Sequence, residues 1–183
     1  NRSFMVHDIS GPGFVVYAPL NLSYTDSATI DFYFNVSDAS EISSCELYVK
    51  GFLSESNASV DKNITQHFRK DPIGTDGNYD WFINCTDTKG NVGTSGSRNV
   101  TVDLKTPQIL YGSPTAENNS YESAGWIFIE VNYTEINPAN ITIVLINSSG
   151  LVNYSVIEED LDSPFSFNMT NLNGDEDYSY NVT

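Results

Sequence analysis

Hydrophobic and polar residues alternate along much of the chain with a period of two. In residues 28–38 one face carries only large apolar side chains: Ile30, Phe32, Phe34 and Val36. The other face carries Asp31, Tyr33 and Asn35. The same alternation places three further sets inward: Cys45, Leu47 and Val49; Tyr79, Trp81, Ile83 and Cys85; Val100, Val102 and Leu104. Period two indicates half-buried strands, and the turn residues between the runs predict an all-β sandwich or barrel.

A repeat of about 95 residues organises these strands. Asn35–Asp38 ends one strand, and Asn132–Glu135 ends another 97 residues later. Two more pairs match: Tyr17–Asn21 with Gly112–Ala116, and Gly77–Trp81 with Glu176–Tyr180. A unit of this length with about seven strands has the size of an immunoglobulin-like sandwich. The repeat therefore predicts two tandem Ig-like modules, residues 10–104 and 105–183.

The two ends of the chain do not fit this repeat. Residues 97–104 supply the final strand of module one, whereas module two reaches Thr183 without a comparable strand. Residues 1–9 resemble that final strand and are followed by a Pro/Gly linker. We expect an N-terminal strand without a module of its own and a second module that lacks its last strand. The chain is either a part of a longer tandem array, or its first strand completes the second module of another copy.

Charge and composition narrow the choice of partners. Asp and Glu number 24 against 8 Lys and Arg, a net charge of −16. Such a surface repels phosphate backbones and anionic lipids, so we expect no nucleic-acid partner. The 10 Phe, 11 Tyr and 2 Trp argue against disorder. The longest apolar run, Ile141–Ile146, is far too short for a membrane span.

Asn-X-Ser/Thr sequons are unusually frequent. Random order would give about four, because roughly a fifth of the asparagines would head one by chance. The chain has fourteen: Asn1, Asn21, Asn35, Asn57, Asn63, Asn84, Asn99, Asn118, Asn132, Asn140, Asn147, Asn153, Asn168 and Asn181. The excess predicts a heavily N-glycosylated protein outside the cytosol, and two cysteines fit such an oxidising compartment.

Strand phase also predicts where the sugars lie. In eight sequons the middle residue is a core residue by phase or type: Val36, Ile64, Cys85, Val100, Tyr133, Ile141, Met169 and Val182. Because side chains alternate along a strand, the flanking asparagine and Ser or Thr then point outward together. We expect glycans to cover the faces of both sandwiches and to leave the ends free for contacts.

Residues suited to catalysis or metal binding are scarce. His7 and His67 have no metal-ligand spacing, and no nucleophile elbow or phosphate loop occurs. We expect no enzyme, no catalytic residues, no metal and no cofactor other than N-linked glycans. Calcium is a weaker hypothesis for two acidic runs, neither of which matches an EF-hand loop: Glu158, Glu159, Asp160 and Asp162; Asp175, Glu176 and Asp177.

Residues 76–91, DGNYDWFINCTDTKGN, resemble the strand F to strand G passage of tandem Ig-like domains in archaeal-type cell-surface and extracellular filament glycoproteins. Ser43–Val49 resembles their strand C, and Thr106-Pro107 their interdomain linker. The resemblance implies a surface coat, an adhesin stalk or a filament building block. Module two departs from the pattern: it has no cysteine pair, and Val182 stands near the place of Ile83 or Cys85.

Cys45 and Cys85 are predicted to form a disulfide. Both are in phase with inward residues, on strands that correspond to C and F. These strands are neighbours in one sheet of an Ig-like module, so the bridge would join adjacent strands.

The unmatched ends predict how copies join. Phe4 and Val6 alternate correctly to fill a slot left by a missing last strand, and Tyr178, Tyr180 and Val182 would flank that slot. An open sheet edge attracts such a strand. We therefore expect a structural subunit of an extracellular glycosylated filament or coat, whose partners are copies of itself joined head to tail. The alternative is an adhesin or stalk fragment of a longer array that binds a glycan or protein.

Overall fold

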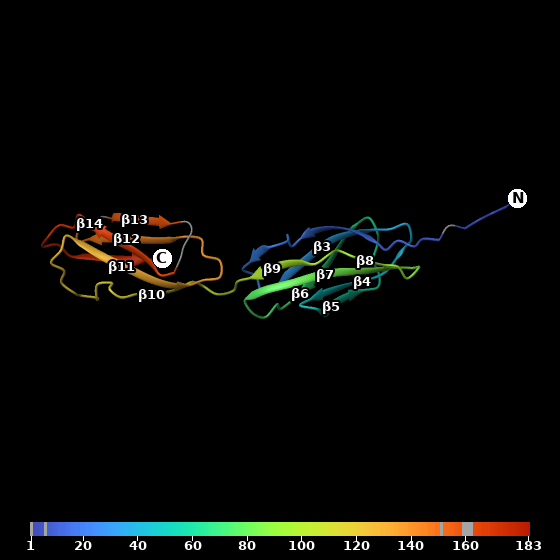
Figure 1. Cartoon of the computed structure of the whole chain (residues 1–183), viewed down its shortest axis with the longest axis horizontal. Coiled ribbons are helices and arrows are strands. Elements are labelled where there is room, and N and C mark those ends of the chain that lie inside the picture. The colour runs from blue at the N-terminus through green and yellow to red at the C-terminus, as the bar shows by residue number, and fades with distance from the viewer. Residues whose placement is uncertain (1, 6, 151, 159–162) are drawn as a thin grey trace. The chain divides into compact units, whose positions relative to one another are not determined.

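The computed structural model describes residues 2–5, 7–150, 152–158 and 163–183 of the chain (Figure 1). It divides into two compact units, Asn1–Leu104 and Lys105–Thr183. Every regular element in these residues is a β-strand, which confirms the all-β class. Accordingly, the described part of the chain holds no helix that could cross a membrane.

Unit one is a sandwich of two sheets. Its strands are β1 (Gly13–Ala18), β2 (Ser23–Thr25), β3 (Ile30–Ser37), β4 (Ile42–Val49), β5 (Phe52–Asn57), β6 (Thr65–Lys70), β7 (Gly77–Asp87), β8 (Val92–Thr94) and β9 (Arg98–Val102). One sheet has the order β1-β3-β6, and the other the order β2-β9-β7-β4-β5, with β8 also paired to β7. This division of the strands is that of an Ig-like sandwich.

The core of unit one follows the alternation in the sequence. Ile30, Phe32, Phe34 and Val36 are all buried, and the polar residues between them are not. Trp81 lies at the centre, edge-on to Phe32 with ring centroids 4.8 Å apart. The inward phases predicted for the strands around Cys45, Trp81 and Val100 are likewise confirmed.

Cys45 and Cys85 form a disulfide, as predicted. They are directly opposite each other on the antiparallel strands β4 and β7, with Cα atoms 4.1 Å apart. The bridge therefore joins neighbours within one sheet and does not connect the two sheets. Both side chains are fully buried.

Two expectations for the core of unit one were wrong. Leu104 is 39% exposed, because β9 ends at Val102. Ile64 is 53% exposed, because it precedes β6 and follows Asn63, whose φ of 65° places it in a turn. At the N-terminus, the residues that the structure describes between 2 and 8 pair with no strand of their own chain.

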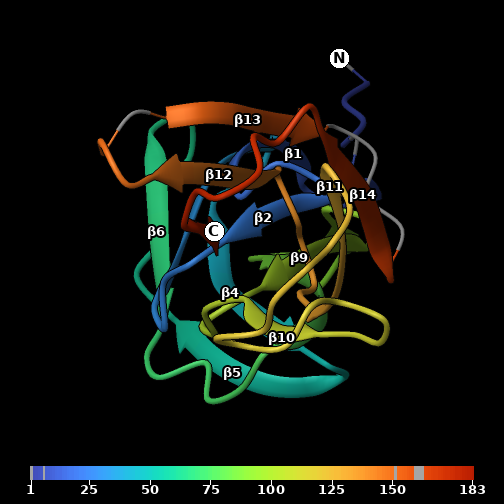
Figure 2. The ribbon, with the colours of Figure 1, turned by 90° about the vertical axis from the view of Figure 1, so that its left-hand side faces the viewer.

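In its described residues, unit two repeats the sandwich with fewer strands. These are β10 (Gln108–Tyr111), β11 (Trp126–Thr134), β12 (Ile141–Asn147), β13 (Val152–Glu158), β14 (Phe165–Thr170) and β15 (Tyr178–Val182). One sheet has the order β10-β11-β14 and the other β13-β12-β15. β12 and β13 run side by side in Figure 2. The core gathers apolar residues from both sheets: Ile129, Val131, Ile141, Ile143, Leu145, Met169 and Val182.

Candidate functional site

The free edge of β15 is where the two units differ most. In unit one β7 is paired on one side with β4 and on the other with β9. In unit two β15 is paired with β12, and no second strand of the described chain flanks it. The strand that corresponds to β7 thus lies at a sheet edge, where backbone N–H and C=O groups can pair with another strand.

A tyrosine near the start of each of these strands fixes the match between the units. The Tyr79 hydroxyl lies 2.7 Å from the carbonyl oxygen of Thr75, four residues upstream. The Tyr178 hydroxyl accepts a hydrogen bond of 3.0 Å from the amide of Asn173, five residues upstream. This is the tyrosine corner of Ig-like sandwiches. Tyr178 therefore corresponds to Tyr79.

This match assigns the remaining positions on β15. Tyr180 takes the place of Trp81, and Val182 takes that of Ile83, the first of the two alternatives left by the sequence. The cross-strand partners are compatible with this choice, since Ile83 is opposite the buried Leu47 and Val182 opposite the buried Ile143, but they do not select it, because Cys85 is likewise opposite the buried Cys45.

The three predicted groove residues lie together on β15. Val182 is buried, whereas Tyr178 and Tyr180 are partly buried against the core of unit two. The Tyr180 hydroxyl donates a hydrogen bond of 3.3 Å to the carbonyl oxygen of Ala116, and its ring meets that of Tyr111 edge-on. Burial, together with Tyr111 and Glu117, raises the pKa of Tyr180.

The predicted donor residues lie in an exposed segment. Phe4 is 89% exposed, and Val6 lies outside the described residues. The segment is attached to unit one at Asp8, whose carboxylate accepts a 2.7 Å hydrogen bond from the Ser40 hydroxyl. The Asn91 side chain donates to the Asp8 carbonyl oxygen at 3.2 Å.

The attachment continues through the Pro/Gly linker. The Pro12 backbone passes so close to Gly93 on β8 that a Cβ at Gly93 would overlap the Pro12 carbonyl oxygen. A Cβ at Gly11 would likewise overlap the Val92 carbonyl oxygen. Residues 8–12 are therefore fixed on their own unit, and the donor residues precede this fixed point.

Three carboxylates meet at the same place, although no pattern in the sequence indicates it. Asp8, Asp38 and Asp87 have carboxylate oxygens within 4.8 Å of one another, and Asp87 is 1% exposed. Each comes from a different part of the chain, so no short motif contains the group. Among the described residues this is the one group of three that could hold a cation through oxygen ligands.

The three carboxylates differ in the direction of their pKa shifts. A hydrogen bond from the Ser40 hydroxyl, followed by one from the Ser10 amide, lowers the pKa of Asp8. A hydrogen bond from the Ser40 amide lowers the pKa of Asp38, but burial and the neighbouring Asp8 and Asp87 outweigh it and raise that pKa. Burial alone would raise the pKa of Asp87, but hydrogen bonds, chiefly those from Asn91, lower it.

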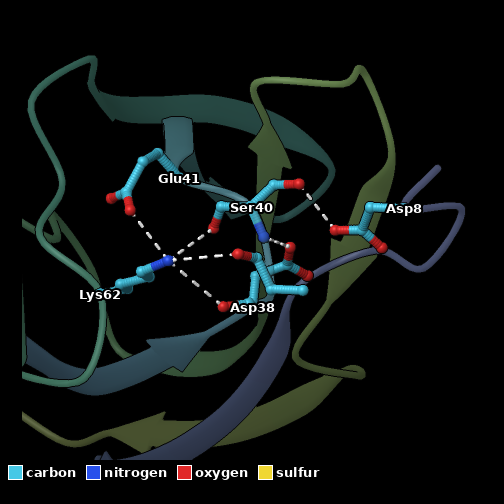
Figure 3. A network of polar contacts seen from close by, with 6 residues as sticks. Asp8, Asp38, Ser40, Glu41 and Lys62 are labelled. Atoms are coloured by element: carbon cyan, nitrogen blue, oxygen red, sulfur yellow. Dashed lines mark hydrogen bonds and ion pairs between the residues drawn. The ribbon is translucent and has the colours of Figure 1, made fainter. Parts of the chain in front are cut away.

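Lys62 holds the loop that carries Asp38 (Figure 3). Its ammonium group donates to the carbonyl oxygens of Asp38, Ala39 and Ser40, at 3.5, 3.4 and 3.2 Å respectively. It also forms an ion pair of 2.9 Å with Glu41. These contacts order the loop backbone and leave the carboxylate of Asp38 facing Asp8.

The described residues gather no metal-sized group in either acidic run considered for calcium. Glu159, Asp160 and Asp162 lie outside the described residues, and of Glu158 only the backbone is described, at the end of β13. Glu176 is engaged by the Tyr178 hydroxyl, and neither neighbouring aspartate joins it in a metal-sized group of the kind found around Asp87.

The sequon asparagines lie at the surface wherever their side chains are described. Asn1 lies outside the described residues, as does the side chain of Asn153, and none of the other twelve is buried. Of the eight predicted core residues inside sequons, six are buried: Val36, Cys85, Val100, Ile141, Met169 and Val182. Tyr133 is partly buried against the core of unit two, and Ile64 is the exception noted above.

Two pairs of flat rings lie on the outer faces of unit one. Tyr33 on β3 stacks on His67 of β6 at 4.7 Å, and His67 in turn contacts Asp31 at 2.8 Å. Tyr48 on β4 stacks on Phe82 of β7 with ring centroids 4.9 Å apart and planes within 5°.

Comparison with known proteins adds distant structural likenesses. No protein-family model matches the sequence, and no curated protein matches it. Fibronectin(III)-like modules of Clostridium thermocellum CbhA are 15% identical over 93% of this chain and 85% of theirs, with a TM-score of 0.45. The BSP domain of a biofilm associated protein is 16% identical over 92% of this chain and 27% of its own, with a TM-score of 0.33. An amphioxus IgVJ-C2 molecule is 14% identical over 88% of this chain and 98% of its own, with a TM-score of 0.36.

Proposed function

We propose that the chain is a structural subunit of an extracellular, N-glycosylated surface filament or coat, joined head to tail by β-strand complementation. The observation that carries the proposal is the free edge of β15, at the position where β7 is covered by β9. The N-terminal segment of another copy is the proposed occupant of this edge, because its sequence resembles that of β9. Strand addition to an open edge is a known mode of recognition.

The match to β9 gives the joint a definite register. With Arg2 placed on Arg98, Phe4 takes the position of Val100 and Val6 that of Val102. Both of those valines are buried in unit one. Val100 is opposite Tyr79, which corresponds to Tyr178. In the proposed joint Phe4 is therefore opposite Tyr178.

The energetics favour occupation of the edge. Two apolar side chains contribute about 1.5–3 kcal/mol each when buried. Ladder hydrogen bonds add about 1 kcal/mol apiece, against the entropy lost on association. Because donor and acceptor are different surfaces of one chain, the contact is heterologous, and it gives an open filament when the rotation between copies does not close a ring.

The disulfide and the sequons support an extracellular location. The buried disulfide between Cys45 and Cys85 suits an oxidising compartment. The outward position of the described sequon asparagines leaves them accessible to glycosylation. Intact mass of the protein isolated from its source tests this part: a mass above 20.2 kDa that falls to that value on deglycosylation is expected.

Paired cysteines test the joint and its register. Met5 corresponds to Thr101, which is opposite Asn78, and Asn78 corresponds to Asp177. Both Met5 and Asp177 are exposed, so the double variant Met5→Cys with Asp177→Cys leaves the core intact. On assembly under mild oxidation it is expected to give a ladder of covalent oligomers on a non-reducing gel.

The matched control moves one cysteine by two residues. Met5→Cys with Ser179→Cys places the Cα atoms about 7–8 Å apart, beyond the usual range for a disulfide. This pair is expected to remain largely monomeric on the gel. Equal ladders from both variants would contradict the register. Monomers from both, or assembly that persists after Phe4→Asp, would reject strand complementation.

The second candidate is an adhesin or stalk fragment of a longer tandem array. The connection between β10 and β11 favours it, because Tyr121 is fully exposed there and Trp126 is about half exposed at its end. Exposed aromatics on a loop suit contacts with a glycan or protein. In a longer array the same final strand would complete a module within one polypeptide. A denatured, reduced subunit much heavier than the deglycosylated 20.2 kDa chain identifies this case.

A further inference from the structure

Two sequons differ from the rest in what precedes them on the strand. Asn35 and Asn84 are the sequon asparagines with an aromatic residue two positions earlier, Tyr33 and Phe82 respectively. Residues two apart on a strand share a face and lie about 6.8 Å apart along it. Each asparagine therefore has a ring beside it on the outer face of unit one.

In both cases a second ring on the neighbouring strand stacks on the first. Phe82 is opposite Tyr48, and the two rings stack with 5° between their planes. The Tyr48 hydroxyl donates to Glu46 at 2.7 Å, which fixes the ring and raises the pKa of the phenol. Glu46 is in turn opposite Asn84.

The second case repeats the arrangement on the other sheet. Tyr33 is opposite His67, and the rings stack with 20° between their planes. His67 is fixed by its contact with Asp31 at 2.8 Å. Tyr33 is 40% exposed, so part of its surface is available to a further group.

We propose that these ring pairs are seats for the first sugars of the glycans on Asn35 and Asn84. One face of a sugar ring presents C–H groups, which carry partial positive charge and pack on the negative face of an aromatic ring. A sugar attached to the neighbouring asparagine is tethered there at high effective concentration, which no free ligand matches. The seats order the base of each glycan and stabilise unit one.

The inference rests on the proposed glycosylation. A double-mutant cycle separates the effect of the contact between ring and sugar from the effect of glycosylation itself. The full chain is secreted from a eukaryotic host, its glycans are trimmed to the first N-acetylglucosamine, and thermal unfolding of unit one is followed. The four proteins are the parent, Phe82→Leu, Asn84→Gln and the combination. In the parent background the sugar on Asn84 is expected to raise the midpoint by about 3 °C, the size of one aromatic contact. In the Phe82→Leu background this increment is expected to fall to near zero.

A second readout and a matched control exclude a general effect on folding. Sugar C–H protons above the ring are expected to shift upfield in NMR spectra of the trimmed protein and to return to ordinary positions in Phe82→Leu. The control sequon is Asn63 of unit one, which lies in the turn before β6 and has Asp61 two positions earlier. Phe82→Leu is expected to leave the increment from Asn63→Gln unchanged. Tyr33→Leu with Asn35→Gln repeats the cycle on the other sheet.

Each outcome decides the matter. Occupied sequons with an increment that does not depend on Phe82 or Tyr33 overturn the seats and leave the glycoprotein proposal standing. Empty Asn35 and Asn84 beside other occupied sequons do the same. Absence of sugar from every sequon overturns both proposals.

Discussion

At the scale of single residues, Asp38 is the member of the carboxylate cluster that opposes folding. Its pKa is raised in the folded chain, so the folded state holds that proton more tightly than the unfolded state does. Its charge therefore destabilises the fold above the folded pKa, and this penalty is relieved as the pH falls through that value. Asp8 and Asp87 have lowered pKa values, and their stabilisation is lost on acidification.

Asp38→Asn is expected to raise the thermal midpoint of unit one at pH 7. The amide oxygen still accepts the 2.8 Å hydrogen bond from the Ser40 amide, while the repulsion from Asp8 and Asp87 is gone. The advantage over the parent is expected to shrink as the pH falls below the folded pKa of Asp38. Calorimetry at several pH values checks this, with unglycosylated protein because the change creates a new sequon with Ser40. A midpoint that falls at pH 7 would mean that Asp38 is held by an attractive partner.

Single residues also mark the limits of prediction from the sequence. Alternation identified Phe32 and Phe34 as core because nothing interrupts β3. It failed at Ile64, because the turn at Asn63 comes between that residue and the preceding strand, and β6 starts only after it. The meeting of Asp8, Asp38 and Asp87 could not be predicted, since it depends on how three segments far apart in the sequence approach in space.

At the scale of elements, the short strand β8 has two roles. It pairs with β7 through Asn84, Cys85 and Thr86, and it supports the linker that carries the proposed donor segment. Only a residue without a side chain allows the Pro12 backbone to pass Gly93. The residues Lys89-Gly90-Asn91 predict the turn before β8, but no pattern in the sequence predicts this contact.

Gly93→Ala is expected to displace residues 8–12 from β8. The added Cβ meets the Pro12 backbone, which cannot move aside as a flexible side chain would. Overpacking of this kind destabilises by about 1–3 kcal/mol. Hydrogen exchange of the Val92 and Gly93 amides, together with chemical denaturation, measures the effect. Gly174→Ala is the control, because no atom lies within 4 Å of its added Cβ. Similar losses for both variants would argue against the contact.

The disulfide between β4 and β7 is expected to stabilise unit one alone. Cys45→Ala with Cys85→Val removes it, and the chain-entropy model gives a loss of about 3–4 kcal/mol for a closed loop of roughly 40 residues. Unit two has no cysteine, so its unfolding is expected to stay in place. Calorimetry that resolves two transitions tests this, and a matching shift in the second transition would show that the units unfold together.

At the scale of the whole molecule, the two units share one sandwich plan, and the described residues of unit two build it with fewer strands. The repeat in the sequence predicted two sandwiches, and in the described residues β15 pairs with β12 alone. The tyrosine corners were not recognised from the sequence, because a hydroxyl that reaches back four or five residues is visible only in the folded chain. They convert the weak sequence similarity around Tyr79 and Tyr178 into an alignment of structural positions.

The position of the disulfide also has a mechanical consequence. When a force separates residues 8 and 104, the segment between Cys45 and Cys85, a sequence separation of 40, cannot lengthen. At about 3.4 Å for each extended residue, the hidden length is about 13 nm. In single-molecule stretching, rupture of unit one is expected to release that much less chain under oxidising than under reducing conditions. Equal lengths in both conditions would show that the bridge lies outside the path of the load. A tether built from such units lengthens less when one unit unfolds with its disulfide intact than when the disulfide is reduced.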